Sequence, residues 1–372
     1  MRFGTVGTNF IVDWFIAAGE SCPEFVHSAV YSRTAERAAA FAAKHGGVEN
    51  MFTDLIAMAE SSVVDAVYIA SPTSEHARQA LVFIRAGKHV FVEKPACSNA
   101  RELEEVLAAA REHGVCFMEG MRSVRSPGFL AARDALSTLG PVRHATLGFC
   151  QLSSRWPAYL RGENPNAFKL ELCNGALMDL GCYCVYAAVA LLGRPTSVTC
   201  EVLMLPTGVD SAGTAVLRYP ESIATLTFSK QSHSFNRSEI QTEDGTLSID
   251  HLGEFGEVTL QKKGEAKPTV LFAPPASPAL PNNLVYEVAA FIDLVAANAA
   301  SGKQEDDVLS WQLARDVAWV MDECRSAAGI VWLSEIARSA GVVGSVGVPV
   351  GTVVGAVGLS VEQLRSGRPS RA

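Results

Sequence analysis

Strand-like and helix-like segments alternate over the first 120 residues, and this alternation limits the fold more than any other feature of the chain. The strand candidates are short apolar or β-branched runs at residues 3–6, 26–31, 63–70, 90–92 and 115–118. Strands that alternate with helices form a parallel sheet with right-handed crossovers. The sequence therefore predicts a doubly wound α/β domain, a Rossmann fold, over residues 1–120.

Length and composition limit the remaining possibilities. At 372 residues the chain exceeds the size at which a single core stops growing, about 250–300 residues, so we expect two domains. A net charge of −8 without basic runs argues against nucleic acid as a partner. No uninterrupted apolar stretch reaches about 18 residues, so we expect no membrane span. The nine cysteines lack Cys-x-x-Cys spacing, which argues against a metal site and fits a reduced, cytoplasmic compartment.

The first strand candidate leads into a turn at the position of a dinucleotide-binding loop, where glycines let the backbone approach a pyrophosphate. Gly7 holds the first place of the G-x-G-x-x-G/A pattern, whereas Asn9 and Val12 replace the other small residues. Because asparagine tolerates left-handed backbone angles, we expect Asn9 to make the turn. An ordinary strand–helix turn is the alternative. The candidate loop residues are Gly7, Thr8, Asn9, Phe10 and Ile11.

Ser32 and Arg33 follow the second strand candidate, where NAD-binding sheets carry an acidic residue for the ribose 2′-hydroxyl. A hydroxyl and a guanidinium instead suit a 2′-phosphate through charge-assisted hydrogen bonds. NADP is therefore the expected cofactor, with NAD as the second choice. The alternative is that Arg33 is a solvated residue of the following helix.

Glu93, Lys94 and Pro95 end the strand candidate at residues 90–92. Pro95 has no amide hydrogen for a ladder, so Lys94 lies at the carboxyl end of a strand, where open α/β sheets bind their ligands. A solvated lysine at an ordinary strand exit is the alternative. A second set of candidate cofactor residues follows the third strand: Ser71, Pro72, Thr73 and His76. His76 either contacts the cofactor or is a surface residue of the next helix.

From residue 142 the pattern changes to alternating strands, which predicts an α+β domain over residues 121–335 with an open, mainly antiparallel sheet. The strand candidates are residues 142–152, 198–205, 212–219, 222–229, 237–242, 246–250 and 257–261. We expect one helix over residues 175–192, with Asp179 and Tyr183 on one face because they are four residues apart. Alternatively, Tyr183 is a core aromatic and Asp179 a capping or solvated acid.

The C-terminal part is predicted to be helical. Residues 263–283 are rich in Pro and Ala and are expected to form a linker. Two helices should follow at residues 284–300 and 306–328, the second with an acidic start that favours its dipole. Residues 336–372 are rich in Gly and Val, and we expect a poorly ordered tail.

Taken together, these motifs resemble the Gfo/Idh/MocA oxidoreductases. The loop at residues 7–11, the Ser32–Arg33 pair and the segments at residues 71–76 and 93–95 occur in the family's order. Residues 174–183 are similar to its D-x-G-x-H/Y signature, in the tyrosine version. The resemblance implies hydride transfer between a nicotinamide and a hydroxyl or carbonyl carbon of a sugar, polyol or dihydrodiol. It also implies a dimer formed through the second sheet.

The resemblance assigns roles to single residues. Lys94 would lie beside the nicotinamide and the reacting substrate oxygen, Tyr183 would donate or accept the proton, and Asp179 would line the same pocket. A nearby ammonium such as Lys94 would favour the tyrosine phenolate. Glu93 and Pro95 would shape the loop, often with a cis peptide before the proline. Arg122 stands on the substrate side, where many members carry an aromatic residue.

Two other functions compete with this hypothesis. A cofactor-binding regulator or sensor without turnover would explain the altered phosphate loop and Arg122, although Lys94, Asp179 and Tyr183 are all retained. A pyridoxal phosphate enzyme using Lys94 would leave the first strand–turn–helix unexplained.

Overall fold

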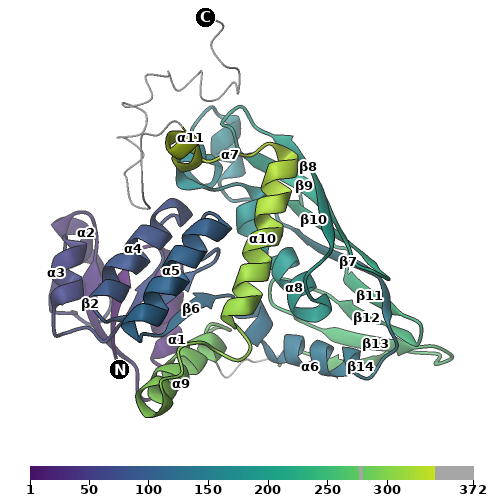
Figure 1. Cartoon of the computed structure of the whole chain (residues 1–372), viewed down its shortest axis with the longest axis horizontal. Coiled ribbons are helices and arrows are strands. Elements are labelled where there is room, and N and C mark those ends of the chain that lie inside the picture. Colours follow the sequence, from purple (N-terminus) through teal and green to yellow (C-terminus); the bar gives the residue numbers. More distant parts are fainter. Residues whose placement is uncertain (276–279, 340–372) are drawn as a thin grey trace, which may run out of the picture.

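The computed structural model describes residues 1–275 and 280–339. Within them the chain forms two sheets, each covered by helices (Figure 1). Most of the tail expected at residues 336–372 lies outside the described residues.

The first sheet has six parallel strands in the order β3-β2-β1-β4-β5-β6 within the described residues. The strands are β1 (Arg2–Val6), β2 (Val26–Tyr31), β3 (Asn50–Phe52), β4 (Ala66–Ile69), β5 (His89–Glu93) and β6 (Phe117–Gly120). The connecting helices are α1 (Phe10–Gly19), α2 (Ala35–Lys44), α3 (Leu55–Glu60), α4 (Thr73–Arg85) and α5 (Ala100–His113). This strand order is the Rossmann order, and the predicted doubly wound domain is confirmed.

Three details of this sheet differ from the prediction. Strand β4 spans only Ala66–Ile69, whereas residues 63–70 were expected. Strand β3 was not expected, because three residues at the edge of a sheet carry too little apolar pattern to be recognised. Strand β6 begins two residues later than expected, at Phe117. Its pairing with β5 starts there, opposite Val90, although the apolar run begins at Val115.

The second sheet has eight strands in the order β14-β13-β12-β11-β7-β10-β9-β8 within the described residues. They are β7 (Val142–Cys150), β8 (Ser197–Met204), β9 (Asp210–Arg218), β10 (Ile223–Ser229), β11 (Ser238–Thr242), β12 (Gly245–Ile249), β13 (Val258–Lys262) and β14 (Thr269–Phe272). Neighbours pair antiparallel except β7 and β10, which are parallel. The expected open, mainly antiparallel sheet is confirmed.

The remaining helices lie along the second half of the chain. They are α6 (Pro127–Leu136), α7 (Trp156–Leu160), α8 (Cys182–Leu192), α9 (Val285–Ser301), α10 (Trp311–Ala328) and α11 (Leu333–Ser339). Helix α10 contacts α5 of the first half as well as α8 and β8 of the second, so it connects the two halves (Figure 1). The segment Leu170–Leu192 has the length and apolar composition of a membrane-crossing helix, and 78% of its apolar window is buried inside the protein.

Two predictions for the C-terminal part are wrong. The expected linker at residues 263–283 contains strand β14, which pairs along β13 at the edge of the sheet. The expected helix at residues 306–328 begins at Trp311, capped by Ser310. Asp306 lies outside the helix because its carboxylate accepts from the backbone N–H groups of Val308 and Leu309 and forms a local turn.

The helix expected at residues 175–192 is also different, because a π-helical turn, Leu177–Gly181, precedes α8. The backbone N–H of Cys182 donates to the carbonyl of Leu177, five residues earlier. The buried carboxylate of Asp210 accepts from the N–H of Leu177 at 2.6 Å and so caps the start of this turn. Asp179 and Tyr183 therefore lie on two kinds of helical backbone.

Candidate active site

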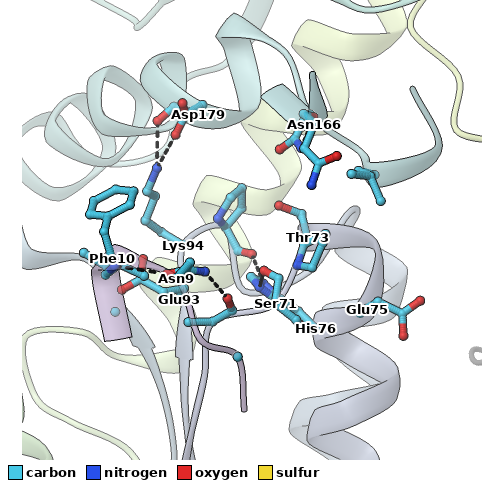
Figure 2. Close-up of a pocket in the computed structure, with 18 of the residues that line it drawn as sticks. Asn9, Phe10, Ser71, Thr73, Glu75, His76, Glu93, Lys94, Asn166 and Asp179 are labelled. Atoms are coloured by element: carbon cyan, nitrogen blue, oxygen red, sulfur yellow. Dashed lines mark hydrogen bonds and ion pairs between the residues drawn. The ribbon is translucent and has the colours of Figure 1, made fainter. Parts of the chain in front are cut away.

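A cleft of about 1060 Å³ runs along the carboxyl edge of the first sheet and continues against the second half of the chain. This volume is at the upper end of about 300–1,000 Å³ that small-molecule sites usually have. Figure 2 shows side chains from both halves facing this cleft, with Thr73 on one side and Asn166 and Asp179 opposite. The cleft lies where the strand order reverses, at the switch point between β1 and β4.

The loop between β1 and α1 lines one end of the cleft. Gly7 has a φ of +119°, and a Cβ there would lie 3.0 Å from the carbonyl oxygen of Ala70, so only glycine fits without strain. Asn9 caps α1 with a φ of −93°: its side chain accepts from the N–H of Ile11 and donates to the carbonyl of Ala70 at 2.7 Å. The expectation of a left-handed Asn9 is therefore wrong. Gly7 makes the turn, and Asn9 ties it to the end of β4.

Three arginines line the cleft beside this loop, since β2 and β4 flank β1. Arg33 follows β2 as expected, with the buried Ser32 beside it. Arg37 of α2 and Arg78 of α4 also line the cleft, and Arg78 is paired with Glu75. Sequence reasoning missed Arg37, because Arg33 precedes helix α2 and the two residues share no helix face. This end of the cleft is suited to an anion.

His76 joins the two loops that flank the cleft. Its ring nitrogens lie 2.8 Å from the carbonyl oxygen of Ser71 and 2.9 Å from that of Pro95. The side chain is 1% exposed, so the alternative of a surface residue is wrong. Burial lowers the pKa of His76, and a neutral imidazole has one N–H, so it donates to one of the two carbonyls. The peptide between Lys94 and Pro95 is cis.

Lys94 meets Asp179 at the centre of the cleft. Its Nζ donates to Oδ1 of Asp179 at 2.8 Å and to the Asp179 carbonyl oxygen at 2.9 Å (Figure 2). In a regular α-helix that carbonyl would accept from the backbone N–H of Tyr183, four residues on. Asp179 lies in the π-helical turn, and such turns often occur at functional sites.

A second lysine, Lys230, completes this cluster. It follows β10, is 4% exposed, and its Nζ lies 2.6 Å from Oδ2 of Asp179. Sequence reasoning missed Lys230. The only indication in the sequence is its position directly after a strand. The Asp179 carboxylate is thus held between two ammonium groups.

The charges of this cluster stabilise each other. Burial by itself would raise the pKa of Asp179, but Lys94 and Lys230 together hold it well below its usual range. Burial would likewise lower the pKa of Lys94, yet the Asp179 carboxylate raises it well above its ordinary value. Both groups are therefore ionised at neutral pH. The alternative of a solvated Lys94 is wrong, since its side chain is 13% exposed.

Tyr183 lies beside the same lysine. The Nζ of Lys94 is 4.9 Å from the centre of its ring, and Phe149 packs edge-on against it at 5.3 Å. Burial raises the pKa of Tyr183, and this outweighs the lowering by Lys94 and Arg122. As expected, Lys94 lowers the pKa of Tyr183, but this lowering is smaller than the rise that burial causes. Tyr183 is a protonated phenol at neutral pH.

Two carboxyl groups, the partly buried Glu93 and the buried Glu119, support the loop that carries Lys94. Glu93 accepts from the hydroxyl of Tyr68, and burial raises the pKa of Glu93. Glu119, at the end of β6, accepts from the backbone N–H of Ala96 at 2.8 Å and from the hydroxyl of Tyr186. Burial raises the pKa of Glu119 to about 7. These contacts fix the loop that carries Lys94.

The end of the cleft beyond Tyr183 combines polar and apolar side chains from the second half of the chain. Arg122 lies there as expected. Sequence reasoning assigned no site role to several other residues of the second half that line the cleft: Phe149, Gln151, Asn166, Leu172, Asn174, His251 and Glu254. They come from separate loops and strand ends, and nothing in their sequence spacing groups them. Among the described residues, no three His, Cys, Asp or Glu side chains gather in a way that could hold a metal ion.

Comparison with known proteins agrees with this geometry. Residues 1–121 match the sequence model of the oxidoreductase family with an NAD-binding Rossmann fold, and residues 129–248 match the GFO/IDH/MocA C-terminal domain. The scyllo-inositol 2-dehydrogenase (NADP⁺) of Bacillus subtilis is 41% identical over 332 residues, which cover 89% of this chain and 98% of the relative. Trans-1,2-dihydrobenzene-1,2-diol dehydrogenase of Macaca fascicularis is 27% identical over 347 residues, with the same shares covered.

Solved structures give the same result. The 3-ketoreductase KijD10 of Actinomadura kijaniata, in complex with NADP and TDP-benzene, has a TM-score of 0.72 at 25% identity, covering 88% of this chain and 98% of that one. A levoglucosan dehydrogenase in complex with NADH shares the fold, with a TM-score of 0.77 at 19% identity, covering 88% of this chain and 97% of that one.

The fold and the cleft therefore define a nicotinamide-dependent oxidoreductase. More specifically, the chain belongs to the Gfo/Idh/MocA family, as its motifs suggested. The alternative of a regulator without turnover finds no support, since these relatives are named as dehydrogenases and a ketoreductase.

Proposed function

We propose that this protein is an NADP-dependent dehydrogenase of a cyclic polyol or sugar, with Lys94, Asp179 and Tyr183 as its catalytic residues. The observation that carries the proposal is the contact of Lys94 with both Asp179 and the ring of Tyr183. These groups meet at the carboxyl edge of a dinucleotide-binding sheet, which is where the nicotinamide of a bound cofactor would be expected.

The residues along the cleft fit NADP. Gly7 leaves room for a close backbone approach, and the N-terminus of α1 provides N–H groups for a pyrophosphate. Arg33 and Arg37 supply positive charge beside this loop, which suits a 2′-phosphate. The proposed cofactor site comprises Gly7, Thr8, Asn9, Phe10, Ile11, Ser32, Arg33, Ser71, Pro72, Thr73, His76, Glu93, Lys94 and Pro95.

The bound nicotinamide cofactor would supply or accept the hydride. In the reductive direction, Tyr183 gives its hydroxyl proton to the substrate oxygen, because it is a protonated phenol at neutral pH. The Lys94 ammonium stabilises the negative charge that develops on the same oxygen. Asp179 holds Lys94 in place through two acceptor oxygens, and Lys230 holds Asp179.

The substrate class follows from the charges around Tyr183. Asp179 is balanced by Lys94 and Lys230, and Arg122 is paired with Glu254. Paired charges and amides such as Gln151 offer donors and acceptors for several hydroxyl groups. This favours a hydroxylated ring, and the 41% identical relative is named for scyllo-inositol. A dihydrodiol is the second candidate, since more distant relatives are named for one.

A cofactor and substrate panel tests the proposal. NADPH and NADH binding would be measured by fluorescence, and oxidation of scyllo-inositol, myo-inositol, glucose and a trans-dihydrodiol by the appearance of reduced cofactor. We expect tighter binding of NADPH and the highest kcat/KM with a cyclic polyol. Equal binding of both cofactors would contradict the NADP assignment, and turnover of the dihydrodiol alone would contradict the substrate assignment.

We further propose that residues 1–120 and 121–335 act as cofactor and substrate domains, and that the protein is a cytoplasmic homodimer. The outer face of the second sheet exposes apolar side chains, including Leu203, Val216 and Ile223. A second copy would cover this face. Light scattering of the purified protein and of Val216→Lys tests the dimer: we expect a dimer for the former and a smaller species for the latter.

A further inference from the structure

Arg122 connects three separate parts of the chain at the wall of the cleft. It lies in a 3₁₀ turn, Arg122–Arg125, directly after β6. Its Nε lies 3.4 Å from the hydroxyl oxygen of Tyr183, and its Nη1 lies 3.0 Å from Oε1 of Glu254 and 3.1 Å from Oδ1 of Asn283. The guanidinium carbon is 5.9 Å from the centre of the Tyr183 ring. The side chain of Arg122 is 16% exposed.

We infer that Arg122 is a positioning residue for Tyr183: it directs the hydroxyl proton of Tyr183 into the cleft and stabilises the tyrosinate that forms when this proton leaves. The inference deepens the proposed function and rests on it. It gives Arg122 a role toward the catalytic tyrosine, in place of direct contact with the substrate. Glu254 and Asn283 then act through Arg122.

The direction of the proton follows from hydrogen-bond chemistry. A guanidinium has five N–H donors and no acceptor, so the Tyr183 oxygen must accept from Arg122. The hydroxyl hydrogen of Tyr183 must then point elsewhere. Lys94, the other cation near Tyr183, is also only a donor. The hydrogen is therefore free to face a substrate oxygen in the cleft.

The loop that carries Glu254 is rigid, so it can hold Arg122 in place. Phe255 is fully buried with a φ of +48°, a left-handed conformation, and packs edge-on against Phe129 at 5.1 Å. A Cβ at Gly128 would lie 1.9 Å from the carbonyl oxygen of Phe255, so helix α6 lies directly against this loop. On the other side, a Cβ at Gly253 would lie 2.6 Å from the ring of Phe149.

The charges facing Tyr183 determine how its proton is held. Burial raises the pKa of Tyr183, Lys94 and Arg122 lower it, and Cys182 and Glu93 raise it. Asp179 faces Lys94, and Glu254 faces Arg122, so each carboxylate partly offsets the cation next to it. When Tyr183 gives its proton to a substrate oxygen, the negative charge left on its oxygen faces the Nε–H of Arg122. A proton from water then restores the phenol.

This arrangement predicts shifts of opposite sign for two substitutions. Arg122→Met removes a cation next to Tyr183 and should raise the pKa of the tyrosine by about one pH unit. Glu254→Gln keeps an oxygen acceptor for Arg122 but removes the offsetting negative charge, and should lower the pKa of Tyr183. A purely structural role would not produce opposite shifts.

The test measures the pH dependence of tyrosinate absorbance in the full-length protein and in both variants, with Tyr183→Phe subtracted from each. The pH profile of kcat/KM on the best substrate provides the second readout. Arg122→Met should lower kcat about tenfold, while KM changes less than about threefold. An increase in KM with unchanged kcat and an unchanged pH profile would mean substrate binding and would overturn the inference.

The remaining outcomes are also decisive. An unchanged Tyr183 titration in Glu254→Gln, or shifts in the same direction in both variants, overturns the inference. Glu254 is half exposed, so Glu254→Gln decides the question even if Arg122→Met fails to fold. The titration needs no turnover, so it still reports on Arg122 if no member of the substrate panel is converted. Lack of conversion would count against the proposed function instead.

Discussion

Lys94 and Asp179 are 85 residues apart in the sequence, yet the ammonium of Lys94 binds both the carboxylate and the backbone carbonyl of Asp179, at 2.8 and 2.9 Å. Lys94 directly follows strand β5 of the first sheet, and Asp179 lies in a π-helical turn of the other half. The contact therefore brings Lys94 and Tyr183 together across the boundary between the two halves.

Lys94→Ala should cut turnover severely, by about 100-fold or more, because the variant loses the cation that stabilises charge on the substrate oxygen. NADPH affinity should stay within about tenfold of the parent, since the phosphate loop and the arginines are unchanged. Steady-state kinetics and NADPH fluorescence measure the two effects. Lys263→Ala, an exposed lysine in the turn after β13, is the control and should behave like the parent. Near-normal turnover of Lys94→Ala would remove Lys94 from the chemistry.

Arg33→Ala should weaken binding of NADPH by about tenfold or more while leaving NADH nearly unaffected. The reason is that a charge-assisted hydrogen bond to a phosphate contributes about 1.5–3 kcal/mol, and NADH lacks the 2′-phosphate. Fluorescence titration of both cofactors provides the measurement. Arg85→Ala, at the exposed end of α4, serves as the matched control. Equal losses for the two cofactors would disprove the 2′-phosphate contact.

Lys230→Met should lower kcat/KM by about tenfold or more, because Asp179 loses one of the two cations that hold its carboxylate in place beside Lys94. Lys230→Arg keeps the charge and should keep kcat/KM near that of the parent. Steady-state kinetics at neutral pH measure both variants. A kcat/KM of Lys230→Met equal to that of the parent would show that Lys230 does not support Asp179 in the reaction.

Glu119→Gln should change the pH dependence of stability. The pKa of Glu119 is about 7 in the folded protein against an ordinary 4.5, so between these values the unfolded chain releases a proton that the folded protein keeps. The free energy of unfolding of the parent therefore falls as pH rises through this window, by up to about 3 kcal/mol from this group. Urea unfolding of both proteins at about pH 5 and about pH 8 measures it. Relative to the parent, Glu119→Gln should be more stable at about pH 8 than at about pH 5. An equal difference in the free energy of unfolding between the two proteins at both pH values would contradict this.

The parallel first sheet and the mainly antiparallel second sheet could be predicted because the period of apolar residues is a local property. Buried parallel strands such as β4 and β5 are apolar throughout, and helices separate them. Strands β3 and β14 were missed because they bury few side chains, so their apolar pattern is weak.

For the site, the sequence by itself offered Lys94, Asp179 and Tyr183 as candidates, because their motifs resemble those of a known family. Lys230, Arg37 and Glu254 came only from the tertiary structure, since single polar residues after a strand, on a helix or in a loop carry no local pattern. The tertiary structure also decided the charge states. Burial raises the pKa of Tyr183 more than the two cations Lys94 and Arg122 lower it. Lys230 helps to lower the pKa of Asp179. Both effects depend on distances between residues that are far apart in the sequence.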